Sequence, residues 1–121
     1  MSELPQLRDA IAAATETLRA LSRLEPQMAQ AGDVIDHCLR AGNKLLVCGN
    51  GRSATDASHF ATELVVRFAN DRRALPAICL TSDSGILTAA GNDYGFDEIF
   101  ARQVAALGVP GDVLIMPDYF R

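Results

Sequence analysis

A short apolar run that leads directly into a glycine-rich turn is the feature that most constrains the fold. Residues 44–48 read Lys-Leu-Leu-Val-Cys, and the turn Gly49-Asn50-Gly51-Arg52-Ser53 follows at once. An unbroken apolar run of this length is typical of a strand that is buried on both faces. From residue 53 to residue 68, apolar side chains return every three or four positions, as they do on one face of a helix. The sequence therefore predicts a strand, a tight turn and a helix in direct succession.

Two further apolar runs, at residues 76–80 and 111–116, predict additional buried strands. Between them, we expect a short helix through residues 86–90 and a longer one over 97–107. Strands that alternate with helices favour a parallel sheet with right-handed crossovers. The predicted fold class is α/β, a three-layer parallel sheet. Because a three-stranded sheet has two poorly covered edges, we expect a partner subunit to cover it or the chain to be the first part of a larger fold.

The N-terminal third is predicted to be helical and to form a region of its own. Pro26 is expected to interrupt it, with a second helix over residues 27–41 that stops at Gly42. The first helix carries an apolar seam at alternating steps of three and four: Leu4, Leu7, Ile11, Ala14, Leu18 and Leu21. This seam fits packing on its own domain and packing between protomers about equally. We assign residues 1–41 to N-terminal helices with a role in oligomerisation and residues 42–121 to the α/β domain.

Charge and hydropathy exclude two classes of partner. The sequence has eleven Lys and Arg residues and 15 Asp and Glu residues, which gives a net charge of −4. The basic residues are scattered apart from Arg67, Arg72 and Arg73, so the basic stripe that a nucleic-acid binder needs is missing. No apolar run approaches the roughly 20 residues that span a bilayer. We expect no nucleic-acid partner and no membrane partner.

The cysteines and the N-terminus indicate a reducing compartment. Cys38, Cys48 and Cys79 lie among apolar neighbours rather than in a metal-binding spacing. Three small buried thiols are typical of a protein kept in reducing conditions. The first residues lack the basic segment and apolar core of a signal peptide. We therefore expect a cytoplasmic protein.

The glycine-rich turn is a candidate anion-binding site. A turn of this kind points successive main-chain N–H groups toward the N-terminus of the following helix, which attracts anions. Ser53 is expected to cap that helix, and its hydroxyl could donate to a phosphate. The spacing is neither that of a Walker loop nor that of a dinucleotide fingerprint, which would need glycine in place of Thr55. By itself, the turn fits a plain strand-to-helix connection as well as a phosphate site.

His59, Glu63 and Arg67 follow one another at intervals of four residues on the predicted helix. An imidazole and a carboxylate one turn apart suit metal binding or proton transfer. The alternative is an exposed ladder in which Glu63 pairs with Arg67. Spacing alone favours the ladder.

Several separated motifs follow one another along the chain. They are Cys48-Gly49-Asn50-Gly51-Arg52-Ser53, Asp56-Ala57, His59-Phe60-Ala61-Thr62-Glu63-Leu64, Arg67-Phe68, Leu75-Pro76-Ala77-Ile78, residues 87–96, Phe100-Ala101-Arg102-Gln103-Val104, and Leu107-Gly108 through Ile115. In their order and spacing they resemble the sugar isomerase (SIS) domain family, and within it the phosphoheptose isomerases, over nearly the whole chain up to Ile115. The resemblance implies a flavodoxin-like SIS fold, so that residues 42–121 would form a partial phosphosugar-binding domain.

The resemblance also implies an activity and a site. It implies an aldose–ketose isomerase that converts sedoheptulose 7-phosphate to glycero-manno-heptose 7-phosphate for lipopolysaccharide synthesis. The residue matching Glu63 is the base that moves a proton between C1 and C2, and residues matching His59 and Glu63 are ligands in members that bind zinc. Positions that hold or line the substrate match Asn50, Gly51, Ser53, Arg67, Asn92 and Asp93. The resemblance further implies a homotetramer.

The sequence departs from the family pattern at two places. Arg52 stands where the family usually has glycine, which places a Cβ where a positive φ is expected. After the third strand, the family continues with a Ser-Thr-Ser-Gly loop that wraps the phosphate, and its last helix supplies the acid histidine and further zinc ligands. Residues 116–121 have no such loop, so we expect a chain truncated at its C-terminus. Two alternatives to an isomerase are a non-catalytic relative that binds a protein such as the replication initiator, and an inactive remnant.

Overall fold

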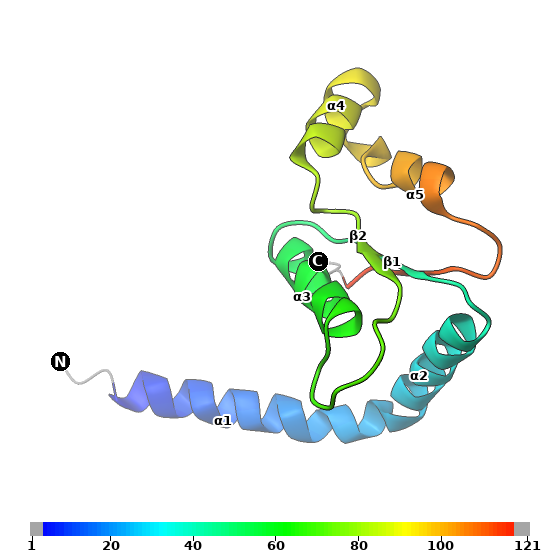
Figure 1. Cartoon of the computed structure of the whole chain (residues 1–121). Coiled ribbons are helices and arrows are strands. Elements are labelled where there is room, and N and C mark those ends of the chain that lie inside the picture. The colour runs from blue at the N-terminus through cyan, green and yellow to red at the C-terminus, as the bar shows by residue number, and fades with distance from the viewer. Residues whose placement is uncertain (1–3, 118–121) are drawn as a thin grey trace. The chain divides into compact units, whose positions relative to one another are not determined.

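A computed structural model describes residues 4–117 (Figure 1). Its elements in chain order are α1 (Leu4–Ala20), the 3-10 helix η1 (Leu21–Leu24), α2 (Glu25–Arg40), β1 (Leu45–Val47), α3 (Arg52–Val65), β2 (Ala77–Cys79), α4 (Ser84–Tyr94), the 3-10 helix η2 (Phe96–Glu98), α5 (Ala101–Leu107) and β3 (Val113–Ile115). The chain divides into two compact units, residues 1–34 and residues 35–121. No helix among the described residues is both long enough and apolar enough to cross a membrane.

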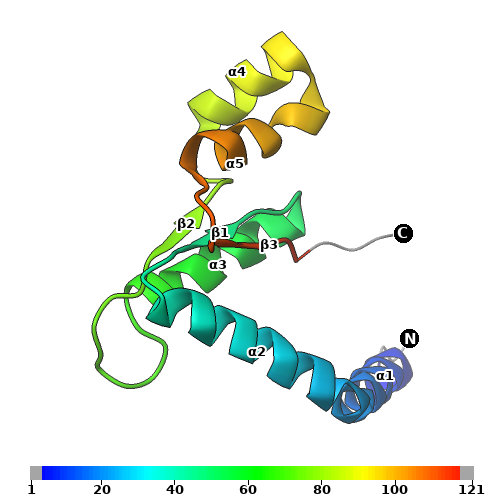
Figure 2. The ribbon, with the colours of Figure 1, turned by 90° about the vertical axis from the view of Figure 1, so that its right-hand side faces the viewer.

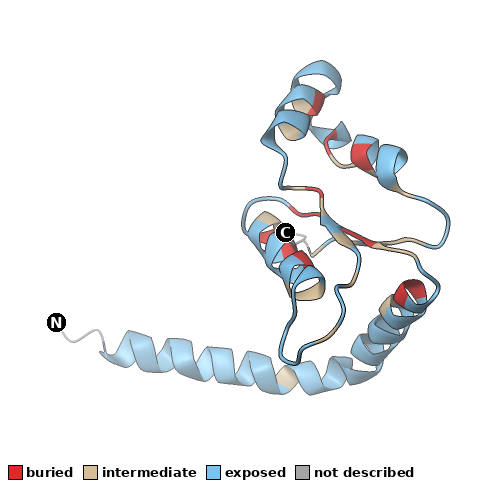
Figure 3. Cartoon of the chain, in the orientation of Figure 1, coloured by how far each residue is buried: buried red, intermediate tan, exposed pale blue. Residues whose placement is uncertain are grey.

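The first unit is helical throughout its described part. None of the residues of α1 is buried, as the pale blue ribbon of Figure 3 shows. The seam residues Leu4, Leu7, Ile11 and Leu18 are more than half exposed, and Leu21 in η1 is 42% exposed. The predicted interruption is present, but it comes earlier, as the tight turn of η1. Pro26 lies instead in the first turn of α2, where its missing N–H would have no helical partner.

The second unit is built on a three-stranded parallel sheet with the order β2-β1-β3. Leu46 in the middle of β1 is in register with Ile78 on one side and Leu114 on the other. All three residues of β1 are buried, because this strand has a neighbour at each edge and cover on each face. The predicted parallel α/β sheet is confirmed.

Helices cover the two faces of the sheet, so the unit has three layers. Leu45 and Val47 point to the face covered by α3 and the last turns of α2, where Ala57, Cys38 and Leu39 are buried. Leu46 and Cys48 point to the opposite face and pack with Leu80, Phe100 and Val104. Figure 2 shows α3 on one side of the sheet and the α4–α5 segment on the other. The alternation along β1 follows from the period of two in a strand.

The boundary between the two units falls inside α2, whereas the sequence placed the change of region after residue 41. Cys38 and Leu39 are buried in the core of the sheet. The last turns of α2 therefore belong to the α/β unit. An oligomerisation role for the N-terminal helices stays a prediction.

Three helices differ from their predicted extents. α3 ends at Val65 rather than at residue 68, so Phe68 lies beyond the helix and is 81% exposed. α4 is longer than predicted because Asp83 caps it, its Oδ1 accepting from the N–H of Ile86 at 3.0 Å. The helix predicted over residues 97–107 is divided into η2 and α5.

Candidate functional site

The turn after β1 depends on glycine at two positions. Gly51 has a φ of +56°, a conformation that side chains with a Cβ rarely adopt, and α3 begins at the next residue. Gly49 is needed for a different reason, since a Cβ there would lie 2.6 Å from the main-chain oxygen of Ser53. The sequence therefore folds as a tight strand-to-helix connection in which the end of β1 nearly touches the first turn of α3.

Two expectations about this turn are wrong. The N-cap of α3 is Gly51 rather than Ser53, and Ser53 is a buried residue of the first turn. Arg52 was expected to need a positive φ, yet no non-glycine residue in the described chain has one. The helix starts with Arg52 because Gly51 already makes the reversal, and the Arg52 side chain lies exposed, 4.0 Å from Asp56.

A cavity of about 550 Å³ opens beside this turn, at the edge where the parallel strands end. Asn50 and Gly51 line it on one side, and α4 and η2 line the other. Its full lining is Gly49, Asn50, Gly51, Ala54, Thr81, Leu87, Thr88, Gly91, Phe96, Ile99 and Phe100. Ligands of open parallel α/β sheets bind at this edge, outside the carboxyl ends of the strands. The size lies within the range of small-molecule sites.

The main chain of the turn leaves donors for a ligand. The N–H groups of Ser53 and Ala54 donate to the carbonyls of Asn50 and Gly51, at 3.0 and 3.1 Å. In the described part of the chain, the N–H groups of Gly51 and Arg52 donate to no main-chain carbonyl. They lie at the positive end of α3, which favours an anionic ligand.

Thr81 is a site residue that sequence reasoning missed. Its hydroxyl donates to the carbonyl of Ala54 at 3.2 Å, which ties the end of β2 to α3. It also lies 2.9 Å from the Cys79 sulfur. Burial raises the pKa of the Cys79 thiol, but hydrogen bonds with Thr81 and Ser82 outweigh it, so that this pKa lies below its ordinary value. The signal for Thr81 was its place directly after the second apolar run, at the ligand-binding edge of the sheet.

The candidate base and its neighbour lie on α3. His59 Nε2 is 2.8 Å from Glu63 Oε1, one helical turn away. The Glu63 side chain is about one-third exposed and that of His59 is largely exposed. The pair is therefore open to a ligand or a partner, as proton transfer requires.

Arg67 does not extend this face. α3 has already ended at Val65, and Arg67 is an exposed residue of the following loop. The expected ladder of three side chains is therefore wrong beyond Glu63. Arg72 instead binds the end of the helix, donating to the carbonyl oxygens of Glu63 at 2.6 Å and Leu64 at 2.9 Å. Spacing gave no sign of this role, because Arg72 lies in the loop and reaches back to the helix.

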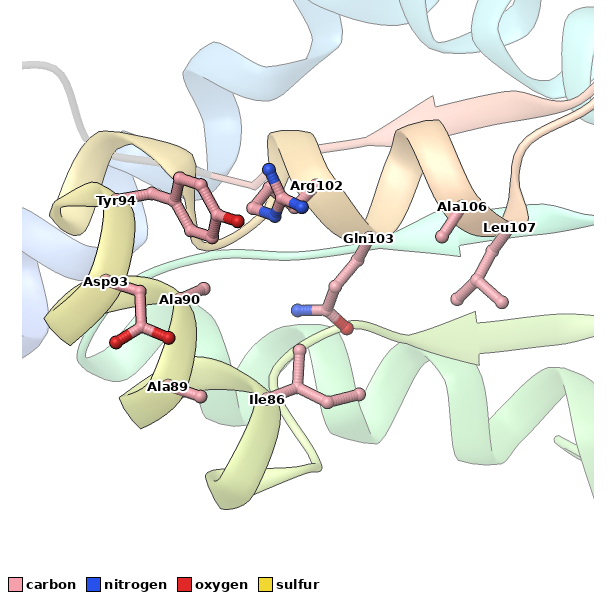
Figure 4. A pocket seen from close by; sticks show the side chains of 9 residues that line it. All are labelled: Ile86, Ala89, Ala90, Asp93, Tyr94, Arg102, Gln103, Ala106 and Leu107. Carbon is pink, nitrogen blue, oxygen red and sulfur yellow. The ribbon is translucent and has the colours of Figure 1, made fainter.

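Asn92 and Asp93 lie near the C-terminal end of α4 and bond to each other, Asn92 Nδ2 donating to Asp93 Oδ1 at 2.9 Å. Neither lines the cavity beside Asn50. Asp93 borders a second cavity between α4 and α5 (Figure 4). Within one chain, the structure does not bring these two residues together with the glycine-rich turn.

Asn50 and Glu63 are also far apart within one chain. They flank most of α3, whose rise of about 1.5 Å per residue separates them by roughly 15–20 Å. The structure thus places the predicted residues in two groups. Asn50 and Gly51 line the cavity, with Ser53 buried in the turn beside it, while His59 and Glu63 lie toward the other end of the helix.

The described residues do not by themselves fit a zinc ion. A zinc site takes at least three protein ligands, and His59 and Glu63 supply two. Nowhere in residues 4–117 do three or more His, Cys, Asp or Glu side chains come together as a metal site would need. Any metal held by this pair needs donors from elsewhere.

Comparison with known proteins gives a consistent result. The family model described as "SIS domain" matches residues 10–118. The phosphoheptose isomerase of Shewanella sediminis is 47% identical over 113 residues, which are 93% of this chain and 57% of that protein. The phosphoheptose isomerase of Syntrophotalea carbinolica is 60% identical over 89 residues, 74% of this chain and 45% of the relative.

Solved structures agree with this match. A phosphoheptose isomerase from Francisella tularensis superposes with a TM-score of 0.89 at 42% identity, over 96% of this chain and 61% of that one. One from Neisseria gonorrhoeae superposes with a TM-score of 0.76 at 43% identity, over 91% and 59%. The chain spans about half the length of the curated relatives it matches.

Proposed function

The chain belongs to the SIS domain family, and from this premise we propose that it acts in the aldose–ketose isomerisation of a phosphosugar. The substrate proposed is sedoheptulose 7-phosphate, which would be converted to glycero-manno-heptose 7-phosphate for lipopolysaccharide synthesis. The relatives are named phosphoheptose isomerases, and they supply the reaction class.

The cavity at the glycine-rich turn is the observation that carries the proposal. It lies at the carboxyl edge of the parallel sheet and is of a size for a small molecule. The N–H groups at the start of α3 favour an anion such as a phosphate. The Asn50 side chain adds an amide that can donate to and accept from sugar hydroxyls.

Glu63 is proposed as the base of the reaction. Its carboxylate would take the proton from C1 of the ketose and return it to C2, while a proton moves from the oxygen on C1 to the oxygen on C2 through an enediol. His59, 2.8 Å away, holds the carboxylate in one orientation. Arg72 fixes the main chain at the same residue by bonding to its carbonyl oxygen. The resemblance assigns the acid to a histidine that lies beyond the motifs matched here.

The positions of Asn50 and Glu63 toward opposite ends of α3 support an active site that is shared between two protomers. Asn50 lines the cavity at the glycine-rich turn, whereas Glu63, near the other end of α3, does not. We therefore propose that the cavity of one copy meets the Glu63 carboxylate of another in a homo-oligomer, a tetramer as the resemblance implies. The exposed apolar seam of α1 supports a helix bundle between copies.

We also propose a bound zinc ion and a cytoplasmic location for the protein. His59 and Glu63 would be two of the ligands of a zinc ion, with the others from outside the described residues, so no step above runs through the metal. Cys38, Cys48 and Cys79 form no disulfide within residues 4–117, which supports a cytoplasmic location.

Binding to the cavity tests the proposal directly. The ¹⁵N-labelled chain is titrated with sedoheptulose 7-phosphate and, in parallel, with sedoheptulose. We expect saturable shifts of the amides of Asn50, Gly51 and Ala54 with the phosphorylated sugar and weaker shifts without the phosphate. If the phosphosugar leaves these amides unmoved while perturbing others, the cavity is not the sugar site.

A further inference from the structure

A second cavity, of about 350 Å³, lies between α4 and α5. It shares no lining residue with the cavity at the glycine-rich turn. Its walls are mostly apolar, formed by Ile86, Ala89, Ala90, Ala106 and Leu107. Figure 4 shows these side chains from both helices around one open space.

The one buried polar side chain in this wall is Gln103, which is 6% exposed. Its Nε2 donates to the carbonyl oxygens of Leu80 and Ile99, both at 2.9 Å. An amide turned the other way would set its own oxygen against two carbonyl oxygens, so this orientation is fixed by the network. In Figure 4, the side chain extends from α5 into the space beside Ile86.

The oxygen of Gln103 is therefore an acceptor without a donor. Both amide protons are used, and within residues 4–117 no group donates to Oε1. No buried side-chain nitrogen or oxygen atom in residues 4–117 lacks a hydrogen-bond partner, so Oε1 is reached by solvent from the cavity. A ligand that donates to it takes the place of a water molecule there. The cavity thus offers one acceptor among apolar walls.

Charges at the rim of the cavity are balanced. Asp93 borders it on α4, and Arg102 borders it on α5. The Arg102 guanidinium lies 3.8 Å from the centre of the Tyr94 ring, so its charge is held over the aromatic face. Asp93 accepts from Asn92. With opposite charges at its edge, the cavity does not select a charged ligand.

We propose that the α4–α5 cavity binds a small uncharged molecule with an apolar body and a single hydrogen-bond donor, which Gln103 Oε1 accepts. The volume lies at the lower end of the range for ligand sites, so a ligand of one ring fits. The apolar walls bind the body of the ligand, and the acceptor selects among molecules of equal size. Asp93, which the resemblance places beside the substrate, borders this cavity, but the cavity shares no lining residue with the one at the glycine-rich turn.

Three one-ring probes separate these contributions. Phenol has a donor, anisole has an oxygen that only accepts, and toluene has neither. Each is titrated into the ¹⁵N-labelled chain, with the shifts of Gln103 and of its side-chain amide as the readout. We expect phenol to bind about three- to tenfold more tightly than anisole or toluene, which is the worth of one neutral hydrogen bond. Equal affinities for phenol and anisole would overturn the role of Gln103.

A matched pair of variants tests the location. Ala106→Phe fills the cavity from an exposed position on α5, whereas Ala105→Phe adds the same ring at an exposed neighbour outside the lining. We expect the first to abolish the phenol shifts and the second to keep them, with both spectra otherwise those of the folded chain. Phenol shifts that survive Ala106→Phe would overturn the site. Shifts of Gln103 on addition of sedoheptulose 7-phosphate would also overturn it, because the cavity would then belong to the sugar site.

Discussion

The Lys44 ammonium nitrogen lies 2.5 Å from Asp112 Oδ2 and joins the chain just before β1 to the chain just before β3. The same carboxylate accepts from the N–H of Lys44 at 3.0 Å and from the N–H of Val109 at 2.9 Å. The Asp112 side chain is 6% exposed. The Lys44 side chain and these N–H groups hold the pKa of Asp112 well below its usual range.

This network predicts a loss of stability in acid. Because the pKa of Asp112 is lower in the folded chain than in the unfolded one, its contribution is present in full above about pH 4, the ordinary value for aspartate. It is lost as the pH falls below that value toward the folded pKa. We expect Asp112→Asn to lower the urea midpoint at pH 7 and to differ less from the unchanged chain at pH 3.

Asp36→Asn is the control for this prediction. Asp36 also bonds to a cation, Arg40, but both side chains are more than half exposed on α2. Exposed pairs contribute little to stability. If Asp36→Asn and Asp112→Asn lowered the urea midpoint at pH 7 equally, the Lys44–Asp112 contact would have no special role in stability.

The two glycines of the strand-to-helix turn are expected to tolerate alanine poorly. Gly51→Ala should cost about 1–2 kcal/mol, because alanine must adopt the left-handed conformation. Gly49→Ala should cost at least as much, because its Cβ would meet the main-chain oxygen of Ser53 at 2.6 Å. Gly32→Ala, in the interior of α2 with open space around it, should instead stabilise its helix by about 0.5–1 kcal/mol. Chemical denaturation measures all three, and a stabilising Gly51→Ala would contradict the account of the turn.

The apolar seam of α1 is predicted to join copies of the chain. Ile11 is 57% exposed within one chain, which suits a contact between protomers. We expect Ile11→Glu to shift light-scattering mass from an oligomer to a monomer. Ala13→Glu, placed off the seam on the same helix, should leave the mass unchanged. A folded monomer of the unchanged chain at micromolar concentration would contradict the proposal.

The sequence predicts the sheet well because its signals are local. A buried run at residues 44–48 and a turn that needs Gly49 and Gly51 are visible in the order of residues alone. The sequence did not predict where α3 ends. Arg72, in the loop that follows the helix, donates to the carbonyl oxygens of Glu63 and Leu64 at this end, and the order of residues does not reveal such a contact. The lining of the cavity was missed at Thr81 for the same reason, since its place depends on how β2 meets α3.

Zinc binding to this chain is predicted to be weak. His59 and Glu63 give two donors where a zinc site needs at least three from protein. We expect isothermal titration to show an affinity weaker than micromolar, and His59→Ala to remove what binding there is. Micromolar or tighter binding that survives His59→Ala would place the metal elsewhere.

The role of Glu63 is tested most directly in a chimaera that joins residues 1–115 to the following part of the Shewanella sediminis relative. The chimaera should isomerise sedoheptulose 7-phosphate, whereas the 121-residue chain alone should do so very slowly or not at all, because the acid and the phosphate loop of the family pattern are missing from it. Glu63→Gln in the chimaera should lower kcat by about 10²–10⁴-fold, the usual contribution of a general base, and the exposed Glu16→Gln should leave it unchanged. If the Glu63→Gln chimaera isomerised the sugar at the unmutated rate, Glu63 would not be the base.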